Sequence, residues 1–127
     1  MHSQQQPELK QKENPVNGIF NQICDLARKH DETGLRQLIA SGICINIYHG
    51  LRTPVAELAF EGEHKAVDLL LNKLGANPNQ ALWGYACRGD KDRVHLLMQE
   101  EGLFPYSAIY GYLVGNCKNE AEALLKI

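Results

Sequence analysis

The sequence has no long hydrophobic run and no apolar leader. No stretch approaches the roughly 20 consecutive apolar residues that a transmembrane helix needs. Residues 1–15, MHSQQQPELKQKENP, are mainly polar or charged and lack the hydrophobic centre of a signal peptide. We therefore expect a soluble protein without a membrane partner, which stays in the cytoplasm or is delivered to a cytosol.

The same N-terminal segment offers almost nothing to bury. Glutamine, glutamate and lysine dominate it, and such a composition cannot offset the conformational entropy that folding removes. The rest of the chain is large enough for one continuous hydrophobic core. The sequence thus predicts a disordered tail over residues 1–15 and one folded domain over residues 16–127.

The sequence has no large excess of either basic or acidic residues. The formal net charge is -2, with acidic and basic residues interspersed along the chain. Proteins that bind nucleic acids or anionic membranes usually carry a strongly basic surface. The charge pattern therefore indicates no nucleic-acid partner.

Paired cysteine motifs are absent as well. Cys24, Cys44, Cys87 and Cys117 lie far apart, and no C-x-x-C sequence joins any two of them. Zinc sites and redox dithiols typically need such close spacings. We expect four free thiols in a reducing compartment, and no metal.

Motifs that would supply catalysis are also lacking. The chain shows no Ser-His-Asp or Cys-His arrangement and no phosphate-binding glycine loop. Glu57, Glu61 and Glu63 form a local acidic cluster, but this spacing at a helix end is more typical of a solvated face than of an acid-base pair. We expect no enzymatic activity from this chain alone and no cofactor.

What the sequence does contain is a helix-turn-helix pattern over residues 53–79, TPVAELAFEGEHKAVDLLLNKLGANPN. Thr53 suits the N-cap of a helix, and Pro54 suits its first position, where the missing amide hydrogen costs nothing. Apolar residues recur at helical spacing on both sides of Gly62. The pattern predicts two short helices, the first ending at Gly62 and the second at Gly75.

This stretch resembles the ankyrin repeat, whose signature is T-P-L-H followed by A, G, V, L-L, G-A and N at fixed offsets. The matching residues are Thr53, Pro54, Val55, Ala59, Gly62, Val67, Leu70, Leu71, Gly75, Ala76 and Asn79. Ala56 stands where the signature has His, so the hydrogen bond from that His to the opening Thr is not available. Leu74 looks like one inserted residue. The resemblance implies an all-α solenoid whose central unit is less stable than usual.

A first helix pair is expected before this stretch. Apolar residues recur at helical spacing from Ile19 to Ala27 and again from Leu35 to Ile39, on either side of a turn at residues 30–31. The opening Thr-Pro is absent here, which suits a terminal unit with one solvated side. We interpret this pair as the N-terminal cap of the array.

Two more pairs follow, and they repeat each other. The segment ALWGY begins at Ala81 and AIYGY begins at Ala108, and the same offset relates Gly75 to Gly102 and Thr53 to Gln80. Helices are predicted over residues 81–88, 94–99, 107–114 and 120–126. The array therefore has four units. Because this step is shorter than a usual ankyrin unit of about 33 residues, we expect tight connections at the later junctions.

The repeated motif also places a glycine at the middle of a helix. Gly84 and Gly111 each cost about 1 kcal/mol relative to alanine, so we expect successive first helices to approach closely there. The aromatic residues of the motif are Trp83, Tyr85, Tyr110 and Tyr112. We interpret them as packing between units, and not as a cofactor or base-stacking site.

Residues 44–52, CINIYHGLR, lie between the first two units. Alternating apolar and polar residues followed by Gly50 predict a β-hairpin-like finger at this junction alone. Two readings stay open for it. Tyr48 and Leu51 can simply pack on the adjacent helices while His49 is solvated, or the finger can contact a partner, as loops on rigid scaffolds often do.

The resemblance implies a protein-protein interaction module that presents its first helices and the finger to another protein. Phe60 is the strongest candidate contact, because an exposed aromatic beside charged residues is typical of an interface hot spot. The expected partner-binding residues are Arg28, Tyr48, His49, Arg52, Glu57, Phe60, Glu61 and Arg88. A looser likeness of the repeated aromatic motif to ankyrin-like arrays of intracellular bacterial effectors implies secretion and delivery to a host cytosol.

Two alternatives remain. The array can be the regulatory or targeting segment of a larger multidomain enzyme, or a structural protein that self-associates. The second alternative rests on residues 121–127, where Ala121, Leu124 and Leu125 continue the apolar helical pattern without a polar cap. We expect this end to be covered by another unit, another domain or a second copy. The simpler reading is a short amphipathic helix that closes the array alone.

Overall fold

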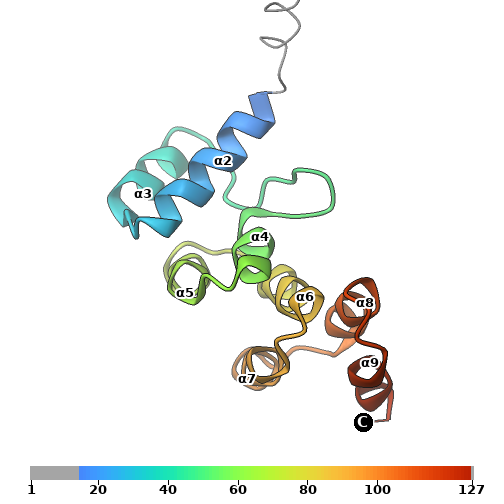
Figure 1. The fold of residues 1–127 in the computed structure, drawn as a ribbon. Helices are drawn as coiled ribbons and strands as arrows, with labels where there is room; N and C mark the ends of the chain where they lie inside the picture. Colours follow the sequence, from blue (N-terminus) through green and yellow to red (C-terminus); the bar gives the residue numbers. More distant parts are fainter. Residues whose placement is uncertain (1–14, 127) are drawn as a thin grey trace, which may run out of the picture.

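The computed structural model describes residues 15–126, and every regular element in that range is a helix (Figure 1). The helices are α2 (Pro15–Arg28), α3 (Glu32–Ala40), α4 (Pro54–Glu61), α5 (His64–Lys73), α6 (Pro78–Arg88), α7 (Lys91–Glu101), α8 (Tyr106–Val114) and α9 (Lys118–Leu125). The prediction of an all-α fold is confirmed. The predicted tail over residues 1–15 lies outside the described residues except for Pro15, which begins α2.

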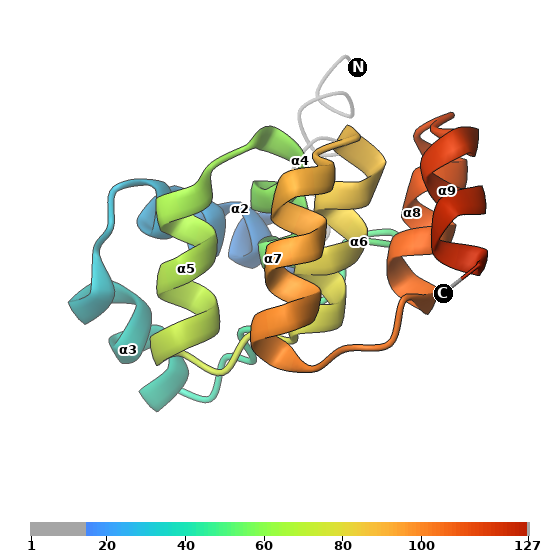
Figure 2. The same ribbon diagram turned by 90° about the horizontal axis from the view of Figure 1, so that it is seen from below.

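The helices are arranged as consecutive pairs, and a short turn joins the two helices of each pair. Within each pair the two helices contact each other, and the first helices α2, α4, α6 and α8 form a row in which each contacts the next. Figure 2 shows α5 and α7 standing side by side in front of α4 and α6, with α9 in front of α8. The first helices therefore form one layer of the molecule, and the second helices form the other.

The turns within the pairs follow the repeat seen in the sequence. Gly62, Gly89 and Asn116 are separated by the same offset as the two aromatic motifs, and all three have positive φ angles, of 78°, 80° and 64°. This left-handed conformation ends the preceding helix and redirects the chain, and glycine adopts it without strain. The periodicity of the sequence is thus present in the backbone from α4 onward.

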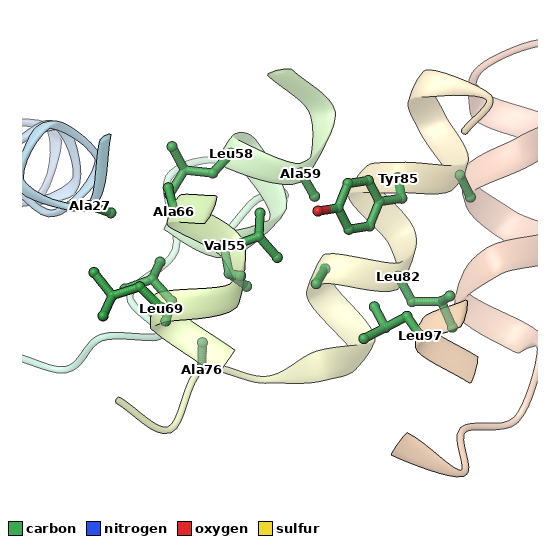
Figure 3. Packing of buried hydrophobic residues seen from close by; sticks show 14 of the residues in the cluster. Ala27, Val55, Leu58, Ala59, Ala66, Leu69, Ala76, Leu82, Tyr85 and Leu97 are labelled. Atoms are coloured by element: carbon green, nitrogen blue, oxygen red, sulfur yellow. The ribbon is translucent and has the colours of Figure 1, made fainter. Parts of the chain in front are cut away.

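One hydrophobic core runs through all four pairs. Figure 3 shows residues of this core from neighbouring helices meeting between the two layers, with Leu58 on α4, Leu69 on α5, Leu82 and Tyr85 on α6, and Leu97 on α7. Burial of each such side chain stabilises the fold by roughly 1.5 to 3 kcal/mol relative to exposure. The pairs share this core with their neighbours, so none of them buries its apolar face alone.

Close approach of the first helices, expected from the two mid-helix glycines, is confirmed. A Cβ atom on Gly84 would meet the carbonyl oxygen of Ala56 and lie 2.9 Å from the Cβ of Ala59. On Gly111 it would lie 2.6 Å from the Trp83 carbonyl oxygen and 2.7 Å from the Cβ of Ala86. Both glycines therefore permit helix contacts that any side chain would obstruct.

Thr53 plays a different part from the predicted one. It occupies the N-cap position of α4, but its side chain makes no capping hydrogen bond. The hydroxyl is buried and donates instead to Oε1 of Gln80, at 3.4 Å. Because Gln80 is the equivalent residue of the next pair, this contact links successive pairs and does not cap one helix.

The predicted hairpin over residues 44–52 is not confirmed. This segment is a loop, with a single antiparallel bridge between His49 and Arg52 and no strand. Gly50, at a φ of 68°, reverses the chain directly after His49, so only these two residues face each other across the turn.

Candidate functional site

An apolar hollow on the first-helix layer lies beside the loop 44–52, next to α6 and α8. Leu51, Gln80, Trp83, Tyr106, Ser107 and Tyr110 line it, and its volume is about 300 Å³. We call it the aromatic groove. None of its lining side chains is charged, so it suits an apolar group better than an ion.

The rings of the groove are ordered by stacking. The Trp83 and Tyr110 rings are nearly parallel, with centroids 6.3 Å apart and an interplanar angle of 19°. Trp83 is 8% exposed and belongs to the floor, whereas Tyr110 is 55% exposed and forms a wall. Phe104 stacks on Tyr106 in a similar way at the α7–α8 junction, with centroids 6.0 Å apart. The result is a preformed aromatic surface open to solvent.

The repeat explains why these rings meet. Ala56, Trp83 and Tyr110 are each one repeat apart and therefore occupy equivalent positions on α4, α6 and α8. Ala56 is buried in a cluster with Trp83, and Trp83 stacks beneath Tyr110. Among the described residues, no further first helix follows α8 to cover Tyr110. Trp83, Tyr85 and Tyr112 are buried, as the interpretation of packing between units expects. Tyr110 also packs on the preceding unit through Trp83, but more than half of it stays exposed to solvent.

Arg52 joins the loop to the groove and to α4. Its guanidinium carbon lies 4.2 Å from the centroid of the Phe60 ring and 5.7 Å from that of Trp83. The same group donates to Oε1 of Glu57 at 2.7 Å. Cation-π contacts of this kind are worth about 0.5 to 1 kcal/mol at exposed sites, so Arg52 fixes the loop modestly while keeping positive charge beside the groove.

A second ion pair continues the charged surface toward α2. Arg28 donates from Nη2 to both carboxylate oxygens of Glu61, at 2.8 and 2.9 Å, which links α2 to α4. Arg28, Arg52, Glu57 and Glu61 together form what we call the ion-pair strip. Partly exposed pairs contribute about 0 to 1 kcal/mol each to stability. The ion pairs therefore contribute little to the stability of the fold, and their main effect is to hold the four charged side chains in fixed positions.

The two carboxylates of the strip differ in proton affinity. Burial raises the pKa of Glu61, and the neighbouring Glu57 raises it further against the opposing effect of Arg28. Burial would raise the pKa of Glu57 too, but its hydrogen bonds with Arg52 and Glu61 and the charges of Arg52 and Arg28 lower it overall. Glu57 is thus the firmer anion, and both groups are engaged by arginines.

The structure brings the predicted contact residues into one region. Tyr48 is exposed, and its hydroxyl lies 3.4 Å from Nε2 of Gln80. His49 is exposed, and its ring meets Phe20 edge-on at 5.2 Å. Arg88 donates from Nη1 to the Phe60 carbonyl oxygen at 3.1 Å, and so satisfies the end of α4. Arg28, Arg52, Glu57, Phe60 and Glu61 meet through the contacts described above.

Sequence reasoning missed the groove itself. The sequence pattern places Leu51 in the loop 44–52 and assigns no contact role to Gln80, Tyr106 or Ser107. The repeat in the sequence contains a usable signal. In a row of equivalent first helices, each helix covers the ring of the one before it, so the ring on the last helix of the row is left exposed. Tyr110 stands at that position within the described part of the chain.

All four cysteines are free thiols, and they should react at different rates. Burial raises the pKa of Cys24 to about 12 and also raises the pKa of Cys87, so both stay protonated and shielded. Cys44 is exposed. We expect iodoacetamide at neutral pH to modify Cys44 first and to reach Cys24 and Cys87 only on unfolding.

Peptide mapping after timed alkylation without reductant measures this order. Rapid modification of Cys24 in the folded protein, or a mass that shows a bridged pair, would contradict the packing described here.

Within residues 15–126, no group of three His, Cys, Asp or Glu side chains is placed to hold a metal ion. None of the helices in that range combines the length and apolar character that crossing a bilayer requires. No family model matches the chain, and no curated protein and no solved structure is significantly similar to it. The likeness to the ankyrin repeat therefore rests on residues 53–79.

Proposed function

We propose that this chain is a protein-protein interaction module, an ankyrin-like array whose aromatic groove and ion-pair strip bind a segment of another protein. The observation that carries the proposal is the groove, a preformed aromatic hollow left open to solvent. Exposed aromatic clusters of this kind usually mark interaction sites. The module acts in a cytosol.

The chemistry of the groove suggests what the partner presents. Tryptophan, tyrosine and arginine are the residues that most often dominate binding energy in interfaces, and Tyr110 and Arg52 both adjoin Trp83 here. The floor is buried and its rings are already stacked, so little ordering is needed on binding. A partner segment would insert an apolar side chain between Leu51 and Tyr110.

The ion-pair strip would add specificity. Its charges lie beside the groove along α4, so a partner segment that follows the first helices meets Arg52 and Glu57 and then Arg28 and Glu61. Charges at the rim of an interface mainly set orientation and association rate. The groove would thus supply affinity, and the strip would fix the direction of the bound segment.

Site-specific photo-crosslinking tests this function. A benzoylphenylalanine placed at Leu51 should capture a discrete protein from extract of the producing cells, and the additional substitution Tyr110→Ala should abolish the product. The matched control is the same probe at Ile39 on α3, which is exposed but does not line the groove. Identical products from both probes would contradict a binding site at the groove.

Replacement of Phe60 by alanine should weaken partner binding by about 2 kcal/mol or more, as truncation of an interface anchor does. Phe60 is exposed and supports Arg52, so its loss removes the surface that holds this arginine beside the groove. The fold should remain nearly intact because little core burial is lost. Calorimetric titration with the crosslinked partner gives the affinity, and a collapse of the melting temperature would show that Phe60 is a core residue instead.

Self-association is a second candidate, favoured by apolar side chains at the last pair. Leu113 and Val114 on α8 and Leu125 on α9 are all exposed. If a second copy covers them, light scattering should show a mass that doubles with rising concentration, and Leu113→Asp should keep the protein monomeric. A native protein that stays monomeric over the whole concentration range removes this candidate.

A further inference from the structure

Two buried tyrosines occupy equivalent positions in the last two pairs, yet their hydroxyl groups differ in surroundings. Tyr85 on α6 and Tyr112 on α8 lie one repeat apart in the sequence, and each is 1% exposed. The Tyr85 hydroxyl lies 3.0 Å from Nδ1 of His64 and accepts from Nη2 of Arg93 at 3.2 Å. The Tyr112 hydroxyl has no hydrogen-bond partner among the described residues.

Arg93 is the group that completes the Tyr85 site. Its guanidinium carbon lies 5.1 Å from the centroid of the Tyr85 ring, and Nη2 is also 3.0 Å from Oδ1 of Asp68. The arginine thus touches the ring, the hydroxyl and an acidic group together. A buried hydroxyl left without a partner destabilises the fold, and the hydrogen bond from Arg93 removes that penalty in this pair.

The equivalent place beside Tyr112 lacks an arginine. One repeat further along the chain, Glu120 stands where Arg93 would be, His95 replaces Asp68 and Lys91 replaces His64. These three residues and Tyr112 line a pocket of about 250 Å³ between α7, α8 and α9. The corresponding hollow beside Tyr85 includes the Arg93 side chain in its wall.

We propose that the Tyr112 pocket binds a guanidinium group, the side chain of an arginine of a partner protein, in the place that Arg93 takes beside Tyr85. The bound group donates to the Tyr112 hydroxyl oxygen and pairs with Glu120. This site is separate from the aromatic groove and does not depend on it.

The charges around Tyr112 favour a cation. Burial raises the pKa of Tyr112 to about 12, and the negative charges of Glu120, Asp90 and Asp92 contribute in the same direction. The Lys91 ammonium opposes a cation, but this residue is exposed, so its side chain can turn toward solvent. A planar guanidinium fits better than an ammonium because its fixed fork of N–H groups can donate to two acceptors at once, the Tyr112 hydroxyl oxygen and the Glu120 carboxylate.

A matched pair of variants tests whether the hydroxyl lacks a partner. Tyr85→Phe removes two hydrogen bonds and should lower the melting temperature, whereas Tyr112→Phe should leave it unchanged or raise it. An equal loss of stability in both variants would mean that the Tyr112 hydroxyl is already satisfied within the chain, and would overturn the proposal.

Binding is tested by NMR titration of the full chain with N-acetylarginine amide. We expect saturable shifts at residues around Tyr112, and none with N-acetylcitrulline amide, which has a similar shape without the charge. Glu120→Gln should weaken the interaction about tenfold or more, since hydrogen bonds to charged groups are strong. The double variant His95→Asp/Glu120→Arg rebuilds the Asp68–Arg93 pattern and should abolish binding by filling the pocket. Equal binding of citrulline, or binding that survives both variants, would overturn the proposal.

Discussion

Replacement of Leu70 by alanine should lower the free energy of unfolding by roughly 2 to 5 kcal/mol, the usual cost of a cavity left by a buried leucine. Leu70 is 0% exposed and lies on α5, which contacts both α2 and α4. The lost side chain therefore weakens the core shared by the first two helix pairs. Denaturant titration followed by circular dichroism measures the change.

The matched control is Leu125→Ala. The same atoms are removed, but this leucine is 68% exposed on α9, so its loss should change stability by less than about 0.5 kcal/mol. A cost below about 1 kcal/mol for Leu70→Ala would mean that α5 does not pack as described.

Replacement of Gly84 by alanine should destabilise the protein by roughly 1 to 3 kcal/mol, although alanine is the better helix former. The added methyl group would meet the Ala56 carbonyl oxygen and the Ala59 Cβ, so α4 and α6 must move apart. This separation would disturb the contact on which the row of first helices depends. Thermal and denaturant unfolding give the magnitude.

Gly18→Ala provides the control with the opposite sign. Gly18 lies within α2, and apart from the neighbouring residues and backbone of its own helix no described atom lies within 4 Å of the place its Cβ would take. Only the difference in helix propensity between glycine and alanine then matters, and the free energy of unfolding of the variant should rise by up to about 1 kcal/mol. If both substitutions stabilise the protein, the close approach of α4 and α6 is wrong.

Helical periodicity predicted the elements well and their first residues less well. The helix expected over residues 94–99 begins earlier, at Lys91, because the Asp90 side chain accepts a hydrogen bond from the Arg93 amide and caps it. Apolar spacing starts the helix at Val94, its first apolar residue, and does not detect the polar first turn over residues 91–93. Asp90 itself was the available signal, because aspartate is a favoured N-cap residue and its side chain accepts a hydrogen bond from the backbone amide three residues later.

Contacts between distant segments could not be predicted in the same way. The Arg28–Glu61 pair joins two residues that are far apart in the chain, and it forms only because α2 and α4 lie side by side in the row. Sequence spacing placed both residues on outward helix faces but did not give their mutual distance. Thr53 illustrates the same limit, since its bond to Gln80 depends on how successive pairs stack.

Trp83 offers a direct test of the proposed function, because it is the only tryptophan in the sequence and lies in the floor of the aromatic groove. Protein labelled with 5-fluorotryptophan should give a single ¹⁹F resonance that reports on this position alone. Addition of the partner captured at Leu51 should shift or broaden that resonance, and Tyr110→Ala should reduce the effect at equal partner concentration. An unchanged resonance at partner concentrations that saturate binding would show that the partner does not occupy the groove.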